Sequence, residues 1–152
     1  MISHRHILAI AVPIVISNVS TPLIGLVDTA VMGRLEDPAY IGAIALGAVI
    51  LSFLFWGLGF LRMSTTALTA QAEGAGNNDE VRASLGRAMV IGIGAGCLMI
   101  VLQVPLNTIA FQLVSASGRV EGLSSEYFNI RIWSAPAVLS NYVLLGWFIG
   151  LG

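Results

Sequence analysis

Four long stretches of the chain lack Asp, Glu, Lys and Arg, and polar connections separate them. They cover residues 7–27, 41–61, 88–118 and 132–152. Each is long enough for an α-helix to cross the hydrocarbon core of a bilayer, which takes about 20 apolar residues. The connections RLEDPAY, EGAGNNDEVRAS and SASGRVEGLSSE are rich in Gly, Asn, Ser and charge, which is typical of exposed turns. The pattern predicts four transmembrane helices, at about 7–33, 41–72, 85–114 and 126–152.

Composition supports an all-α membrane protein. The chain is 57% hydrophobic and 10% charged, with a mean hydropathy of +0.89, whereas soluble domains carry about 25% charged residues. Lipid cannot hydrogen-bond the backbone, and the short alternating segments of a β-barrel are absent from the sequence, so helices are expected. The formal net charge of −1 gives no electrostatic footprint for nucleic acid. We expect Asp79 to cap the start of the third helix.

Small residues predict where helices touch. Gly92 and Gly96 form one GxxxG pattern, and Gly146 and Gly150 form another. Such patterns let helix backbones approach closely in lipid. The string GIGAG at 92–96 follows no strand, so a dinucleotide loop is rejected.

Arginine counts in the connections predict the orientation. With the N-terminus in the cytoplasm, the inner side holds three arginines and the outer side two; these are Arg5, Arg82 and Arg87 inside, and Arg34 and Arg119 outside. We therefore expect a multi-pass protein of the cell (inner or plasma) membrane whose N-terminus is cytoplasmic.

Asp28 is the candidate for ion coupling. It lies about five residues inside the outer end of the first predicted helix, roughly 8 Å below the boundary. One interpretation is an interfacial acid that reaches up to water. The other is an acid in a low-dielectric cavity, where its charged form is disfavoured, so that it can take up a proton or hold Na⁺. Either event changes the local charge by one unit.

Pro13 is the candidate hinge of the same helix, because proline removes one backbone hydrogen bond and favours a kink. Asn18 and Thr21 supply polar groups that can line a cavity or bond the freed carbonyls. The alternative interpretation is that the prolines of this helix only shape packing, as in many membrane helices.

Other polar residues within the predicted helices have two interpretations each. Arg62 either faces a cavity near the inner side or extends to lipid phosphate. Arg131 either contacts Asp28 or joins an interfacial ion cluster with Glu121 and Glu126. Four amides, Gln71, Gln103, Asn107 and Asn141, are expected to hydrogen-bond across helices, and Gln71 can also line a cavity.

The sequence contains no enzyme motif. HExxH, P-loop and CxxC patterns are absent from it, and both histidines lie near the N-terminus. We expect no enzymatic activity, no cofactor and no resident metal, apart from Na⁺ at Asp28 if that ion is the coupling ion.

Long segments of the chain resemble the start of a multidrug and toxic compound extrusion (MATE) transporter. They are LAIAVPIVISNVSTPLIGLVDTAVMGRL and IGAIALGAVILSFLFWGLGFLRMSTTALTAQAEGAGN. LRMSTTALTAQA and IRIWSAPAVLSNYVLLGWFIG are similar to the DinF-like branch of the family. The most specific features are the helix-1 proline, then VDT, then TAQxxGAxN after the second helix.

The resemblance implies two six-helix lobes around a central cavity, of which residues 1–152 would form part of the N-terminal lobe, with the remaining helices absent. It implies antiport, in which H⁺ or Na⁺ enters as a cationic or amphipathic drug or toxic compound leaves. Asp28 matches the family's helix-1 acid and Pro13 its helix-1 proline, and protonation of the acid is implied to bend the helix. The expected partners are the lipid bilayer, the coupling ion, an amphipathic substrate and the missing helices. The alternatives are a lipid-linked precursor flippase of the same superfamily and a non-transporting membrane scaffold.

Overall fold

The structure, a computed structural model, describes residues 23, 26–27, 30–31, 37–114 and 117–152. Asp28, Pro13, Asn18 and Thr21 lie outside the described residues, as does most of the first predicted helix. The chain divides into two compact units, residues 1–42 and 43–152. Nearly all of the described residues belong to the second unit, and the fold below is that of this unit and of the helix that leads into it.

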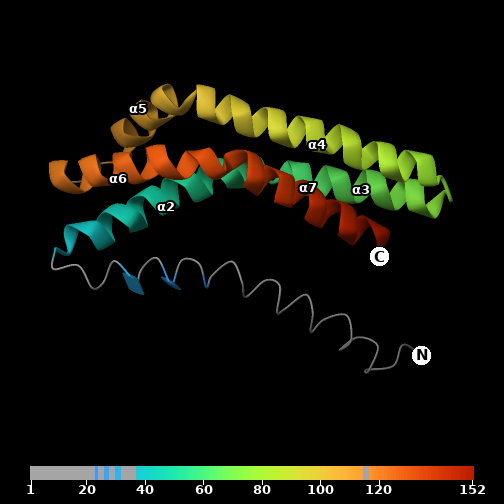
Figure 1. Ribbon diagram of the computed structural model, residues 1–152, viewed down its shortest axis with the longest axis horizontal. Helices are drawn as coiled ribbons and strands as arrows, with labels where there is room; N and C mark the ends of the chain where they lie inside the picture. The colour runs from blue at the N-terminus through green and yellow to red at the C-terminus, as the bar shows by residue number, and fades with distance from the viewer. Residues whose placement is uncertain (1–22, 24–25, 28–29, 32–36, 115–116) are drawn as a thin grey trace. The chain divides into compact units, whose positions relative to one another are not determined.

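The described chain is built from three long helical rods, each divided into two segments (Figure 1). The first rod is α2 (Ala39–Gly57) and α3 (Phe60–Gly74), and the second is α4 (Asn78–Val101) and α5 (Gln103–Leu113). The third is α6 (Gly118–Arg131), the 3₁₀ turn η1 (Ile132–Ser134) and α7 (Ala135–Leu151). Three candidate membrane spans lie within these rods, at residues 39–74, 78–101 and 118–151. The predicted all-α membrane fold is confirmed.

Two helix starts differ from the sequence prediction. The second rod begins at Asn78, and Asn77 caps it by accepting a 3.1 Å hydrogen bond from the backbone N–H of Glu80. The expected cap at Asp79 is therefore wrong, because Asp79 already lies in the first turn. The third rod begins at Gly118 rather than near residue 126. The polar segment GRVEGLSSE, which was predicted as a connection, forms its first turns.

Each rod is interrupted for a local chemical reason. Between α2 and α3, the N–H groups of Leu58 and Gly59 bond carbonyls three residues back, at 3.1 and 2.9 Å, in a tight turn between two glycines. Pro105 lacks the N–H that would bond Val101, so the second rod bends at Leu102. Pro136, in the first turn of α7, likewise lacks the N–H that would bond the carbonyl oxygen of Ile132 in η1.

The hydrophobic core gathers where the interruptions lie. Leu61 follows the first break, Met99 precedes the second, and Ile132 lies in the third. These side chains share one cluster of buried residues with Ile50, Leu51, Phe111, Phe128, Ala135 and Leu139. The core therefore fixes the three bends relative to one another.

Glycine faces allow α7 to pack directly on α3 and α4. A Cβ added at Gly146 would lie 2.5 Å from the backbone oxygen of Arg62, and one at Gly150 would lie 2.6 Å from Cβ of Thr69. On α4, a Cβ at Gly96 would lie 2.5 Å from Cα of Pro136. The helix contacts predicted from both GxxxG patterns are confirmed.

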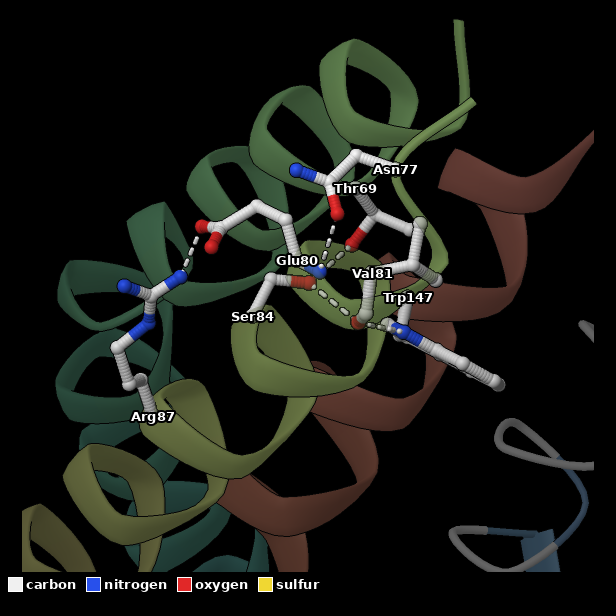
Figure 2. Close-up of polar contacts among 7 residues, drawn as sticks. All are labelled: Thr69, Asn77, Glu80, Val81, Ser84, Arg87 and Trp147. Atoms are coloured by element: carbon white, nitrogen blue, oxygen red, sulfur yellow. Dashed lines mark hydrogen bonds and ion pairs between the residues drawn. The ribbon is translucent and has the colours of Figure 1, made fainter. Parts of the chain in front are cut away.

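Polar side chains fix the end of the unit at which α3 turns into α4 (Figure 2). The indole N–H of Trp147 donates to the carbonyl oxygen of Val81 at 3.0 Å, and the Ser84 hydroxyl donates to the same oxygen at 2.8 Å. Because that hydroxyl has a single hydrogen, Thr69 donates the 3.2 Å bond that joins Thr69 and Ser84. The turn itself needs Gly76, whose φ is 67°. These bonds join α3, α4 and α7 at one end.

Substituting alanine at Gly96 is expected to lower the free energy of unfolding by about 1–3 kcal/mol, because the new methyl group collides with backbone atoms of Pro136. Gly94, two residues earlier on the same helix, has no atom within 4 Å of an added Cβ. Gly94→Ala is therefore the matched control, and it should leave stability unchanged or raise it by about 0.5–1 kcal/mol. Unfolding of the purified chain in a detergent titration measures both, and equal effects would contradict the packing assigned to α4 and α7.

Trp147→Phe is expected to lower the free energy of unfolding by about 0.5–1.5 kcal/mol, since it removes the indole donor while an aromatic side chain remains. Trp133→Phe is the control, because the indole of Trp133 is exposed and has no hydrogen bond to the described residues. The same titration applies. If both variants unfold alike, the Trp147 bond makes no net contribution to stability.

Candidate functional site

The sequence predicted six residues for the site, and the structure describes two of them, Arg62 and Gln71. Both belong to α3 and both are exposed within the described unit. Nine residues separate them, which is two and a half helical turns, so they point from opposite faces of α3 about 14 Å apart along the axis. The structure therefore does not bring Arg62 and Gln71 together in one cavity.

Arg62 lies in the first turn of α3, directly after the interruption between α2 and α3. Its backbone is fixed on one side, where the carbonyl oxygen accepts a 2.9 Å hydrogen bond from the Thr66 hydroxyl and lies against Gly146. Its guanidinium has no ion pair or hydrogen bond with any residue that the structure describes. The charge of Arg62 is thus uncompensated within this unit.

A cavity of about 460 Å³ surrounds Arg62 at the interruption. Its other lining residues are mostly aromatic or lack a side chain: Trp56, Gly57, Gly59, Phe60, Met63 and Tyr142. Gly57 and Gly59, which form the tight turn, have no side chains, and this leaves the pocket open. The sequence contained a signal for it, because an arginine follows two aromatic residues and two glycines at 56–62.

A second polar group lies between α5 and α6. The Asn107 amide donates to the Ser125 hydroxyl at 2.9 Å and to the Asn129 side-chain oxygen at 3.1 Å. The hydrogen bond across helices that was expected of Asn107 is confirmed. Gln103, one turn earlier, has a buried side-chain oxygen without a partner among the described residues, beside an open hollow of about 840 Å³.

Three other expectations for polar residues are wrong within the described chain. Gln71 and Asn141 are exposed, and neither side chain hydrogen-bonds across helices to a described residue. Arg131 forms no ion pair with Glu121 or Glu126, so the expected interfacial cluster is absent there. Gln71 on α3, Arg131 on α6 and Asn141 on α7 are all exposed, so their side chains lie off the packed faces of these helices.

The described residues include no cluster of three or more His, Cys, Asp or Glu side chains able to hold a metal ion. The features that remain for small-molecule chemistry are the Arg62 cavity and the amide group around Asn107. Both lie within rods long and apolar enough to cross a membrane, or in direct continuation of them.

Comparisons with known proteins agree with this architecture. The MatE family profile matches residues 13–152. The chain is 45% identical over 149 residues to the DNA damage-inducible protein F of Escherichia coli, covering 98% of this chain and 32% of that protein. It is 30% identical over 152 residues to the multidrug resistance protein PmpM of Pseudomonas aeruginosa, covering 97% of this chain and 31% of PmpM. For the multidrug resistance protein MdtK of Edwardsiella ictaluri the identity is 28% over 152 residues, covering 97% and 32%.

The chain thus spans about a third of the length of these curated relatives. No solved structure matches it at a significant level. The family match nevertheless extends over more than nine-tenths of the residues, and it agrees with long apolar helices packed through glycine. The chain belongs to the MatE family of membrane transporters.

Proposed function

We propose that this chain forms the N-terminal part of a secondary active antiporter that exports cationic or amphipathic drugs and toxic compounds in exchange for H⁺ or Na⁺. The family match and the relatives named as multidrug resistance proteins support the proposal. The share of about a third of the relatives' length supports a role as part of a larger transporter.

The observation that carries the proposal is Asp28, an acid within an apolar stretch of a MatE-family chain. Acids within membrane segments usually face a cavity or the interior of a helix bundle, where they mark ion pathways. Uptake of H⁺ or Na⁺ there removes one negative charge from a low-dielectric site. Such a change can bias a helix that has two packings of similar energy.

Pro13 supplies the weak point that such a helix needs, because it removes a backbone hydrogen bond fifteen residues before Asp28. Asn18 and Thr21 lie between the two in sequence and are proposed to line the cavity that the acid faces. The helices α3, α4 and α7, by contrast, form a frame, because their close glycine contacts resist deformation.

The protein is proposed to lie in the cell membrane with its N-terminus in the cytoplasm. In that orientation the turn between α3 and α4 is cytoplasmic. Arg82 and Arg87 follow this turn on α4, whereas Arg119 lies at the other end of the unit, in α6. An excess of arginine on the inner side is typical of membrane proteins.

Asp28→Asn tests the coupling step. In everted vesicles that contain the full-length transporter, we expect the variant to lose proton- and sodium-driven efflux of ethidium to the level of empty vesicles, because an amide cannot take up a proton. Expression and membrane insertion should be unchanged. Because an exporter carries dye into the lumen of an everted vesicle, ethidium uptake on imposing a pH or Na⁺ gradient measures the activity, and the gradient that drives it identifies the coupling ion.

Asp79→Asn is the matched control, since it makes the same chemical change at an exposed acid in the first turn of α4 and should leave efflux intact. Persistent gradient-driven efflux in Asp28→Asn would overturn the coupling role of Asp28. Absence of efflux from the unaltered transporter, with translocation of a lipid-linked precursor instead, would favour the flippase. A scaffold would show neither activity.

A further inference from the structure

The cavity around Arg62 combines features that the proposed export of cations does not explain. It places one guanidinium among the side chains of Trp56, Phe60, Met63 and Tyr142, in a volume of about 460 Å³. Pockets for small organic molecules have volumes of about 300–1,000 Å³, mostly apolar walls and few polar groups. The cavity at the first helix break meets this description.

The Arg62 guanidinium is able to bind an anion. Arginine inside an apolar segment is unfavourable unless it pairs or faces a watery cavity, and no described carboxylate pairs with Arg62. Arg62 precedes the end of α3 at Gly74 by more than three turns, about 18 Å. Its planar fork of donors suits a carboxylate, sulfonate or phosphate, which it can bind through two parallel hydrogen bonds.

The rest of the wall suits a flat apolar body. The Trp56 and Phe60 side chains are 77% and 57% exposed, and they follow one another on either side of the Leu58 turn. Tyr142 of α7 adds a third aromatic ring to the wall of the cavity. Aromatic faces stack on flat rings, and the missing side chains of the two glycines leave the space that such a ring would occupy.

We propose that the Arg62 cavity binds amphipathic organic anions, with the acid group on the Arg62 guanidinium and the apolar rings against Trp56 and Phe60. The inference rests on the proposed export function, which it deepens by adding a class of substrate of opposite charge to organic cations. A lipid phosphate offers the same chemistry to Arg62, so the experiment must separate a dissolved anion from a lipid headgroup.

The test compares two probes with the same ring system and opposite charge, pyrenebutyrate and pyrenebutyl-trimethylammonium. Each is titrated against the full-length transporter, and energy transfer from tryptophan to pyrene reports the Kd. No ion gradient is applied. The titration is performed in maltoside micelles, which contain no phosphate, and again in nanodiscs of phosphatidylglycerol.

Arg62→Gln is expected to weaken pyrenebutyrate binding about 10- to 100-fold, the loss of charge-assisted hydrogen bonds, and to leave the cationic probe unaffected. Arg62→Lys should retain part of the affinity, because the charge remains without the planar fork. Phe60→Leu should weaken both probes. Arg82→Gln, at an exposed arginine of α4 outside the cavity, is the matched control and should change neither Kd.

Three results would overturn the inference. An unchanged Kd for pyrenebutyrate in Arg62→Gln would mean that Arg62 does not bind the anion, and equal weakening of both probes would mean that the substitution deforms the pocket. Binding in micelles that disappears in phosphatidylglycerol nanodiscs would assign Arg62 to lipid phosphate. The proposed coupling is judged separately: Asp28→Asn should keep pyrenebutyrate binding while losing efflux, so each proposal can fail without the other.

Discussion

Close contact between helix backbones is the constraint on which the described unit depends. Lipid tails are as apolar as the side chains of a membrane helix, so the hydrophobic effect does not drive helices together in a bilayer. The helices associate instead through van der Waals contact and interhelical hydrogen bonds. Gly96, Gly146 and Gly150 bring α7 against α3 and α4 at distances that a single methyl group would prevent, and Gly92 makes a further tight contact with Val143. The hydrogen bonds of Trp147 and Thr69 lie at one end of the same three helices, where they join α7 and α3 to α4 in a defined orientation (Figure 2).

The candidate binding site of this frame lies at one of the helix interruptions. The breaks at Leu58, Leu102 and η1 border one hydrophobic core, and the first of them opens the cavity that contains Arg62. The same glycines that allow the turn leave room for a ligand. In the proposed transporter the glycine-packed helices would be the rigid support, and the first predicted helix, with Pro13 and Asp28, is the proposed movable element.

Several features were predictable from residues alone because they depend on local composition or on fixed spacing. Long uncharged stretches predicted the rods, and glycines four residues apart predicted the contact faces, since residues with that spacing share one side of a helix. Asn77 was missed as a cap because Asn77, Asn78 and Asp79 are consecutive and all three are residue types that cap helices. Which one caps depends on where the helix begins, and the structure places that start at Asn78. Arg131 lies five residues after Glu126 on the continuous helix α6, which places the two side chains on different faces, and Asn141 is exposed, so neither made the expected contact.

The amino-acid sequence alone was enough to establish that this chain is helical, lies in a membrane and belongs to a transporter family, and that its first predicted helix, at about 7–33, carries a single acid. These properties follow from hydropathy, helical period and side-chain chemistry, which act over a few turns of chain. The packing of the helices was needed to bring Asn107 to Ser125 and to place Tyr142 with Trp56 in the wall of the Arg62 cavity. Trp56 and Tyr142 are 86 positions apart in the sequence (142 − 56), and their meeting depends on how the bent rods pack, which no local pattern encodes.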